Sequence, residues 1–385
     1  MAILSSTPSG RILVLNAGSA TLKSTVLDLP DETPRYERSI DWSPAGPAAE
    51  RRAAIDAVLD GAGAVGIAPG TLGVVAHRVV HGGERFTAPT VIDDSVLEAL
   101  EALADLAPLH NPMSVATIQA ARDRLPETPH VASFDTAFHA AMPAVARRYP
   151  VPEAWERDHG IRRYGFHGLS VAWAVDRAAA LLGRRARELR LLVAHLGGGC
   201  SVTAVDRGRS VDTSMGLTPL EGLMMGTRAG SIDPGIVFRL LRAGLSPDEI
   251  EHALEHESGL VGVGGTADMR RLVERSMAGD VRATAAIDMF VRRAAAGIAA
   301  AATTLPSVDA VVFTGGIGEH AASVRAAICE QLGSFGVPVP PVERVDDEEP
   351  DTILAAADGV AVLRVHARED LVMARGALTA VTSRP

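Results

Sequence analysis

Short apolar runs that lead into polar or glycine-rich turns recur along the chain. One spans residues 12–15 and is followed, after a turn, by a partly alternating segment at 22–29. The same layout returns where residues 191–194 lead into a turn at 195–199 and then into 201–205. An apolar run bounded by turn residues is typical of a β-strand. We therefore predict two similar strand–turn–strand hairpins, and their repetition indicates two related halves.

A third apolar run, residues 310–313, enters a glycine-rich stretch at 314–318 and then a helical pattern at 321–332. This order predicts a strand, a glycine turn and a helix. Apolar positions at helical spacing, several introduced by Asp, Ser or Pro, predict further helices at 94–106, 114–125, 169–182 and 283–304. The mixture favours an α/β fold. Four prolines and an acidic run predict an exposed loop at 338–350.

Length and composition narrow the class of protein. A chain of 385 residues exceeds one ordinary hydrophobic core, so we expect two domains. The net charge of −10 argues against a nucleic-acid partner, which needs clustered Lys and Arg. Two cysteines, Cys200 and Cys329, are too few for a disulfide framework. With no apparent secretory signal and no apolar run of membrane-spanning length, we expect a cytoplasmic protein without a membrane partner.

Both predicted hairpin turns carry groups that suit phosphate. The first holds Asn16, Ser19, Thr21 and Lys23 around Gly18, so that amides, hydroxyls and one positive charge can approach an anion. An ordinary hairpin turn explains these residues equally well. The second holds three consecutive glycines at 197–199, which have no packing role, and close approach of a ligand explains them.

Four charged or titratable residues stand at places where strands end or glycines cluster. In segment 77–83, Arg78 and Val80 would share one face of a strand. Arg78 could then bind an anion next to an apolar surface, or it could be a solvated residue of an edge strand. Asp135 follows an apolar run, where a strand end can hold a carboxylate at a cleft. His167 lies in a glycine-flanked loop that also suits a structural histidine. Arg228 has no acidic neighbour in the sequence before Asp233. It could stabilise the charge of a phosphoryl group in the transition state, or it could form a surface salt bridge.

The sequence lacks the residue spacings of several common binding motifs. The chain has no G-x-x-x-x-G-K-[ST], and residues 315–318 do not supply G-x-G-x-x-G, so a P-loop and a dinucleotide-binding Rossmann site are disfavoured. None of the twelve histidines stands in a zinc-ligand spacing. A hard cation with oxygen ligands, such as magnesium, fits the Asp, Glu and Asn residues better.

Together the segments resemble the acetate kinase family, the acetokinase group of acetate, propionate and butyrate kinases. They follow the family's order over most of the chain: NAGSATLK at 16–23, HRVVHGGE at 77–84, APLHNP at 107–112, FDTAFH at 134–139, YGFHG at 164–168, HLGGG at 195–199, MGTRAG at 225–230, FTGGIGE at 313–319 and the Glu369, Asp370 pair.

The resemblance implies a duplicated actin-like, ribonuclease H-like ATPase fold with two lobes and an interlobe active-site cleft. We expect an N-terminal lobe of residues 1–134 and 370–385 and a C-terminal nucleotide-binding lobe of residues 135–369. A cytoplasmic homodimer is the implied assembly. The implied reaction is reversible, direct in-line transfer of the γ-phosphoryl group of ATP to acetate, with Mg²⁺ or Mn²⁺.

The resemblance also implies a role for each motif residue. Asn16 and Glu369 would hold the metal. Arg78 would bind the substrate carboxylate, and Val80, Leu109, Phe166 and Pro219 would enclose its methyl group. Asp135 is the essential acid, and His167 and Arg228 stabilise the transition state. The nucleotide would meet Ser19, Thr21, Lys23, His195, Leu196, Gly197, Gly198, Gly199, Asp268, Met269, Arg270, Gly316, Ile317, Gly318, Glu319 and His320.

A carboxylate substrate is already ionised at neutral pH, so Asp135 need not accept a proton. We therefore expect it to orient an arginine or the metal shell.

Three positions depart from the family pattern. Gly198 replaces the Asn of HLGNG, His320 replaces the Asn of GIGEN, and Ala20 with Thr21 stands where the family often has serines. The changes at Gly198 and His320 would affect nucleotide affinity and nucleotide preference.

Three rival functions remain open from the sequence. A propionate or butyrate kinase would differ only in pocket volume near Val80. A relative that uses pyrophosphate would agree with Gly198 and His320. An actin-like ATPase module would hydrolyse ATP regardless of carboxylic acids.

Overall fold

The computed structural model describes residues 10–18, 21–42, 48–107, 110–342, 351–357 and 359–383. Two site candidates, Ser19 and Leu109, lie outside these residues. The chain divides into two compact units. Unit 1 comprises Met1–Ala137 and Arg368–Pro385, and unit 2 comprises Phe138–Ala367.

These boundaries differ by a few residues from those expected, and the difference assigns Asp135 and Glu369 to unit 1. Asp135 belongs there because it directly follows a strand that pairs with another strand of that unit. Glu369 belongs there because it opens a helix that packs on the same sheet.

Unit 1 is built on a mixed six-stranded sheet in the order β3-β2-β1-β4-β6-β5. Its strands are β1 (Gly10–Ala17), β2 (Thr21–Leu29), β3 (Thr33–Asp41), β4 (Val74–Val79), β5 (Thr90–Val91) and β6 (His130–Phe134). Strands β1, β4 and β6 are parallel, and the remaining pairs are antiparallel. The carboxyl ends of three parallel strands therefore meet at one edge, where α/β sheets hold ligands.

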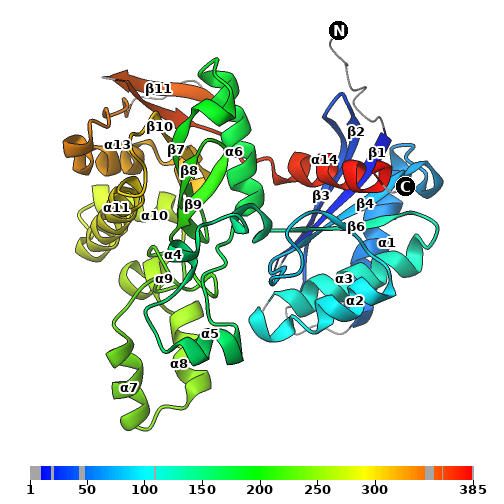
Figure 1. The fold of residues 1–385 in the computed structure, drawn as a ribbon, viewed down its shortest axis with the longest axis horizontal. Helices are drawn as coiled ribbons and strands as arrows, with labels where there is room; N and C mark the ends of the chain where they lie inside the picture. Colours follow the sequence, from blue (N-terminus) through cyan, green and yellow to red (C-terminus); the bar gives the residue numbers. More distant parts are fainter. Residues whose placement is uncertain are drawn as a thin grey trace. The chain divides into compact units, whose positions relative to one another are not determined.

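Helices cover both faces of this sheet (Figure 1). Leu13 and Leu15 of β1 point toward α1 (Ala48–Ala64) and α3 (Asn111–Arg124), in one core with Ile55 and Met113. The alternate residues of β1 are also buried, and α14 (Glu369–Thr382) packs along β1, β4 and β6. Helix α2 (Asp94–Glu101) lies against α3. A sheet buried on both faces explains the nearly continuous apolar run at 12–15.

Unit 2 repeats this sheet strand for strand. Its order, read from the opposite end, is β9-β8-β7-β10-β12-β11, with β7, β10 and β12 parallel and the other pairs antiparallel. The strands are β7 (Arg190–Leu196), β8 (Cys200–Asp206), β9 (Arg209–Thr213), β10 (Ala310–Thr314), β11 (Thr352–Ala357) and β12 (Val360–Arg364). The predicted pair of related halves, and with it the duplicated α/β fold, is confirmed.

The sheet of unit 2 also lies between helices. Helix α6 (Gly168–Leu181) packs on β7 and β10, and α11 (Val281–Ala302) packs on β7 and β8. The other helices are α4 (Ala144–Arg147), α5 (Glu153–His159), α7 (Pro234–Arg242), α8 (Pro247–His256), α9 (Gly259–Gly264), α10 (Met269–Met277), α12 (Gly315–His320) and α13 (Ala322–Gln331). Among the described residues, no helix combines the length and apolarity needed to cross a membrane.

Three local predictions were wrong. Helix α2 ends at Glu101, and residues 104–106 form a separate 3-10 turn. The glycine turn expected at 314–318 is instead the first part of α12, because Gly315 makes the strand-to-helix bend in one step at φ 76°. Strand β4 ends at Val79, so Val80 is buried beyond the strand and does not share its face with Arg78.

A buried histidine pair joins β4 to β6 just before the edge that carries Arg78 and Asp135. His77 Nε2 lies 2.9 Å from His130 Nδ1, and His130 Nε2 lies 3.1 Å from the Leu125 carbonyl oxygen. Because that carbonyl can only accept, His130 carries its proton on Nε2 and accepts from His77. Burial lowers the pKa of each ring, and the neighbouring His130 lowers the pKa of His77 further, so both rings are neutral at physiological pH.

Acid should destabilise unit 1 through this pair. A histidine with a depressed pKa in the folded state contributes stability above its unfolded pKa, near 6.5, and loses it as the pH falls below that value. We expect urea unfolding to show a free energy that falls between about pH 6.5 and 5, by up to ~1.4 kcal/mol per pH unit for each histidine. His130→Gln should reduce this slope, whereas His252→Gln at an exposed site should not. An unchanged slope in His130→Gln would contradict the assignment.

Candidate active site

Arg78 is the centre of a polar cluster in unit 1. It lies next to the carboxyl end of β4, and Asp135 directly follows the neighbouring strand β6. Arg78 Nε donates to Asp135 Oδ1 at 3.0 Å, and Nη2 donates to Oδ2 at 2.5 Å. The Asp135 side chain is 1% exposed and that of Arg78 is 18% exposed. The sheet topology thus produces a nearly buried, two-pronged ion pair from residues 57 positions apart.

Electrostatics keeps this arginine charged. Burial alone would lower the pKa of Arg78, but the charges of Asp135 and Glu369 and the hydrogen bonds that Arg78 donates to Asp135 outweigh it, so the pKa lies above its ordinary value. Asp135 has both carboxylate oxygens in contact with the guanidinium. This geometry matches the expected role of orienting an arginine rather than accepting a proton.

The predicted metal residues extend the same network. Arg78 Nη1 donates to Asn16 Oδ1 at 3.3 Å, and Asn16 Nδ2 donates to Glu369 Oε2 at 3.3 Å. Residues from β1, β4, β6 and α14 therefore form one chain of contacts at the edge of the sheet.

The oxygen donors of this cluster fit magnesium. No group of three or more His, Cys, Asp or Glu with metal-site geometry occurs among the described residues. Magnesium often binds through only one or two protein oxygens and completes its shell with water and substrate phosphates. The Asn16 amide oxygen and the Glu369 carboxylate supply such a pair, because the Asn16 amide nitrogen donates to that carboxylate and holds the two side chains together.

The first hairpin turn brings only part of its predicted set together. Lys23 is exposed and pairs in register with Asn16, so the two side chains lie on one face of the hairpin. Gly18 N donates to the Thr21 carbonyl at 2.8 Å and closes the turn. The Thr21 hydroxyl donates to Asp41 Oδ1 at 3.3 Å, which gives it a structural contact.

Two stacked histidines form the polar cluster of unit 2. The His167 ring lies on the His195 ring with centroids 4.1 Å apart. His167 Nδ1 contacts Ser201 Oγ at 2.9 Å, and His195 Nδ1 contacts Ser170 Oγ at 2.8 Å. His167 has a left-handed backbone, φ 58°, at the start of α6, which is uncommon for a residue with a side chain. Such a conformation is maintained only where the surroundings fix it, as these contacts do.

Arg228 reaches the same cluster. Its Nε donates to Glu255 Oε2 at 2.6 Å, and both side chains are mostly buried. A Cβ atom placed on Gly199 would lie 3.1 Å from His167 Nε2 and 3.8 Å from Arg228 Nη1. The two predicted charge stabilisers therefore approach one point beside the glycine turn, where a side chain would intrude.

Sequence reasoning missed the partners that hold this cluster. Glu255 of α8 lies 27 residues after Arg228, which is in a loop, so no local pattern reveals the pair. Ser201 and Ser170 were missed as well, because an isolated serine in a strand or helix carries no signal.

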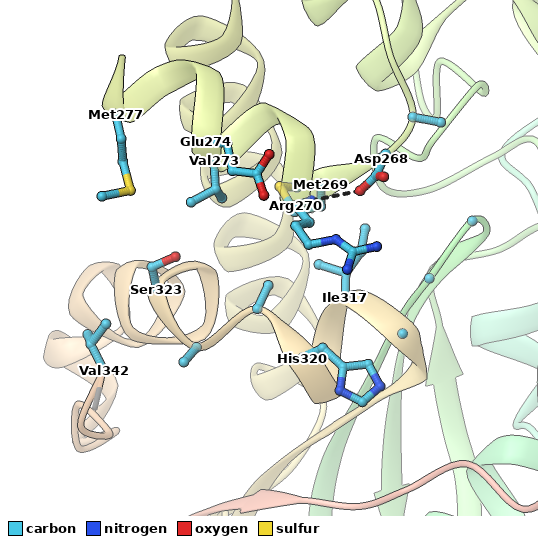
Figure 2. A pocket seen from close by; sticks show the side chains of 16 residues that line it. Asp268, Met269, Arg270, Val273, Glu274, Met277, Ile317, His320, Ser323 and Val342 are labelled. Carbon is cyan, nitrogen blue, oxygen red and sulfur yellow. Dashed lines mark hydrogen bonds between the residues drawn. The ribbon is translucent and has the colours of Figure 1, made fainter. Parts of the chain in front are cut away.

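A cavity of about 770 Å³ lies beside the glycine turn of unit 2. Figure 2 shows α10 on one side, with Arg270 reaching toward the facing helix α12 that carries Ile317 and His320. Asp268 caps α10 by accepting from the backbone N–H groups of Arg270 and Arg271. The lining includes the following nucleotide candidates: Gly197, Gly198, Asp268, Met269, Arg270, Gly316, Ile317 and His320. A Cβ on Gly198 would meet nothing within 4 Å, so the position of the missing Asn is open space.

Other nucleotide candidates lie outside the cavity lining. Leu196 and Gly318 are buried in the core, and His195 and Gly199 belong to the histidine cluster. The Glu319 carboxylate is 7% exposed and accepts hydrogen bonds from His366 Nδ1 and the Ala367 backbone N–H. The Glu319 carboxylate is therefore engaged by the segment that follows β12.

The two substrate-pocket candidates of unit 2 are buried. The carbonyl of Phe166 accepts from Nε2 of the buried His139, whose Nδ1 contacts Ser210 Oγ at 2.9 Å. Burial lowers the pKa of His139 to about 4, so this ring is neutral at physiological pH. Pro219 lies in a loop whose start is fixed by Arg163, which donates to the carbonyls of residues 213–215.

Comparison with known proteins agrees with this geometry. The sequence profile of the Acetokinase family matches residues 11–375. The chain is 43% identical to an acetate kinase of Gloeobacter violaceus over 95% of this chain and 98% of the relative. Its structure is similar to a propionate kinase from Francisella tularensis (TM-score 0.86, 34% identity, 95% and 98% of the two chains). It is also similar to an acetate kinase from Porphyromonas gingivalis (TM-score 0.87, 31% identity, 97% and 100%).

The family match spans nearly the whole chain, and the relative is aligned over almost its full length. The duplicated sheet agrees with these matches over both units. The chain belongs to the acetokinase family.

Proposed function

We propose that this chain is an acetate kinase, which transfers the γ-phosphoryl group of ATP to acetate and yields acetyl phosphate and ADP. The observation that carries the proposal is the Arg78 guanidinium, oriented by a buried Asp135, in a chain whose full-length relatives are acetate kinases. A cytoplasmic location is part of the proposal.

Arg78 has donors to spare for a carboxylate. A guanidinium has five N–H groups. Within the part of the chain that the structure describes, two of these groups donate to Asp135 and one donates to Asn16, so two remain for a substrate. Acetate is ionised at neutral pH and needs no general base, so the task of the protein is to position a weak nucleophile. A rigidly held arginine performs that task better than a mobile one, because less side-chain freedom is lost on binding.

In unit 2, the cavity accepts the nucleoside and the adjacent glycine turn takes the phosphates. The Gly197–Gly199 backbone has no side chains to obstruct the approach of phosphate oxygens. His167 and Arg228 converge beside Gly199, where they offset negative charge on the transferring group. Magnesium, when bound, would neutralise phosphate charge, and Asn16 and Glu369 are the residues that would hold it.

A second acid substrate is supported by one observation. The solved structures that this chain resembles include a propionate kinase at 34% identity. One methylene in an apolar pocket changes specificity by only ~1–3 kcal/mol, so both acids are candidate substrates of this site. We place acetate first because the curated relatives at 43–50% identity are acetate kinases.

Acetyl phosphate formation tests the proposal directly. A hydroxamate assay with ATP, magnesium and a panel of acetate, propionate and butyrate should give the highest kcat/KM with acetate. Pyrophosphate in place of ATP should give no product. ATP hydrolysis that is indifferent to all three acids would contradict the proposal in favour of an ATPase module.

The matched variant for this assay is Arg228→Ala. Loss of a preorganised charge-stabilising donor should lower kcat by about 10² or more with a smaller change in KM. Arg52→Ala, which removes an exposed arginine paired with Asp123, serves as the control and should keep wild-type turnover. Wild-type kcat in Arg228→Ala would remove this residue from the proposed chemistry.

We further propose a homodimer that buries α7. This amphipathic helix has no buried residue, and Ile236, Phe238 and Leu241 are exposed on it. The adjoining α7 and α8 project from the sheet of unit 2 (Figure 1), with basic Arg239 on α7 and acidic Glu251 on α8. An exposed apolar helix flanked by opposite charges suits a self-complementary twofold contact.

Light scattering should give a mass twice the 40.1 kDa of one chain. Phe238→Asp should shift it to the monomer, because burying an unpaired carboxylate in an apolar interface is costly. Val145→Asp introduces the same charge at an exposed valine of α4 and should remain dimeric. A monomeric wild type, or a dimer that persists in Phe238→Asp, would exclude this interface.

A further inference from the structure

Helix α12 has two functional sides. Gly316, Ile317 and His320 face the cavity (Figure 2). Glu319 lies on the other side and is nearly buried. Arg325 of α13, itself buried, donates from Nη1 to the carbonyls of Gly318 and Glu319, both at 2.8 Å. These hydrogen bonds hold the backbone of Gly318 and Glu319 against α13. Because Glu319 is part of α12, its carboxylate must follow any displacement of that helix.

The Glu319 carboxylate holds the segment that follows β12. It accepts from His366 Nδ1 at 2.5 Å and from the Ala367 backbone N–H at 3.1 Å. Burial alone would raise the pKa of Glu319, but these two hydrogen bonds lower it below its ordinary value, so the group is a carboxylate. Trp173 Nε1 donates to the carbonyl of His366 at 2.8 Å and fixes the same segment from α6.

This segment leads directly to the candidate acceptor residues. Ala367 is the last residue of unit 2, and Arg368 begins the part of the chain that returns to unit 1. Glu369, two residues after Ala367, opens α14 and accepts from Asn16, which in turn accepts from Arg78. A short series of hydrogen bonds and peptide bonds therefore runs from the cavity wall through Glu319 to the Arg78 network.

We infer that Glu319 is a positioning residue that couples occupation of the cavity by a nucleotide to binding of the carboxylic acid at Arg78. The inference rests on the proposed function and deepens it. A nucleotide that presses on α12 acts on the carboxylate that anchors Ala367, and hence on the position of Glu369. Coupling between two ligands is reciprocal, so the acid must alter nucleotide affinity by the same factor. Glu319 sets this factor without touching either ligand.

The coupling factor can be measured by calorimetry of ADP binding to the full chain, with and without saturating acetate. Wild type should show an ADP Kd that acetate changes by about fivefold or more. Glu319→Ala should bring this ratio to within about twofold of one, with the Kd in the absence of acetate little changed. Glu319→Gln keeps an acceptor for Ala367 N–H but loses the charge toward His366, and should give an intermediate ratio.

Ile317→Ala is the matched control on the same helix, because Ile317 lines the cavity and does not hold Ala367. It should change the ADP Kd and keep the wild-type ratio. An unchanged ratio in both Glu319 variants would overturn the inference, as would a wild type without coupling. Weaker ADP binding in Glu319→Ala with an unchanged ratio would instead make Glu319 a nucleotide ligand.

The outcome separates the inference from the proposed function. A wild type that forms acetyl phosphate while the Glu319 variants retain the full coupling ratio would defeat only the inference. A wild type that forms no acetyl phosphate would defeat both. Glu319→Gln, which is isosteric, guards against a result caused by misfolding of Glu319→Ala, and circular dichroism spectra of both variants should match wild type.

Discussion

The ion pair between Arg78 and Asp135 is the interaction on which the polar architecture of unit 1 depends. A nearly buried carboxylate is tolerated only when it is paired, and removing one partner of such a pair typically costs ~3–5 kcal/mol. The pair therefore locks the ends of β4 and β6 together and presents the guanidinium in one orientation. Asn16 and Glu369 connect to that guanidinium, so β1 and α14 are drawn into the same arrangement.

Unit 2 uses the same sheet for a different chemistry. In the first hairpin, Asn16 pairs with Lys23, one step before the pair Ala17 and Leu22 that ends the ladder. In the second hairpin, His195 pairs with Ser201 at the equivalent step. The duplicated scaffold thus places an amide and an ammonium group in one unit, and an imidazole and a hydroxyl group in the other. A Cβ on Gly198 in the second turn would meet nothing within 4 Å, so this side of the cavity is open.

Much of this architecture could be predicted from the sequence. Two apolar runs with matching turns, at 12–15 and 191–194, were sufficient to predict two related halves, because strand periodicity is a local signal. The position of Asp135 at a strand end was also predictable. The start of α12 was not, since a glycine-rich segment permits both a turn and a helix, and the choice depends on the left-handed Gly315.

Local sequence patterns could not predict the partners of the site residues. Glu255 meets Arg228 across 27 residues, and Glu319 meets His366 across 47. Such contacts follow from the packing of helices on the sheet, which one sequence does not specify. The resemblance to the acetokinase family supplied the identities of the candidate residues. The structure adds the reason for their geometry, and it shows that the Glu319 carboxylate holds the segment that follows β12.

The central claim is that Asp135 acts through Arg78, and a double-mutant cycle on kcat/KM for acetate tests it most directly. Arg78→Ala and Asp135→Ala should each lower kcat/KM by about 10² or more, and the double variant should be little worse than either single variant. Such non-additivity follows when the two residues work as one unit. Losses that multiply in the double variant would show independent roles and would contradict the account.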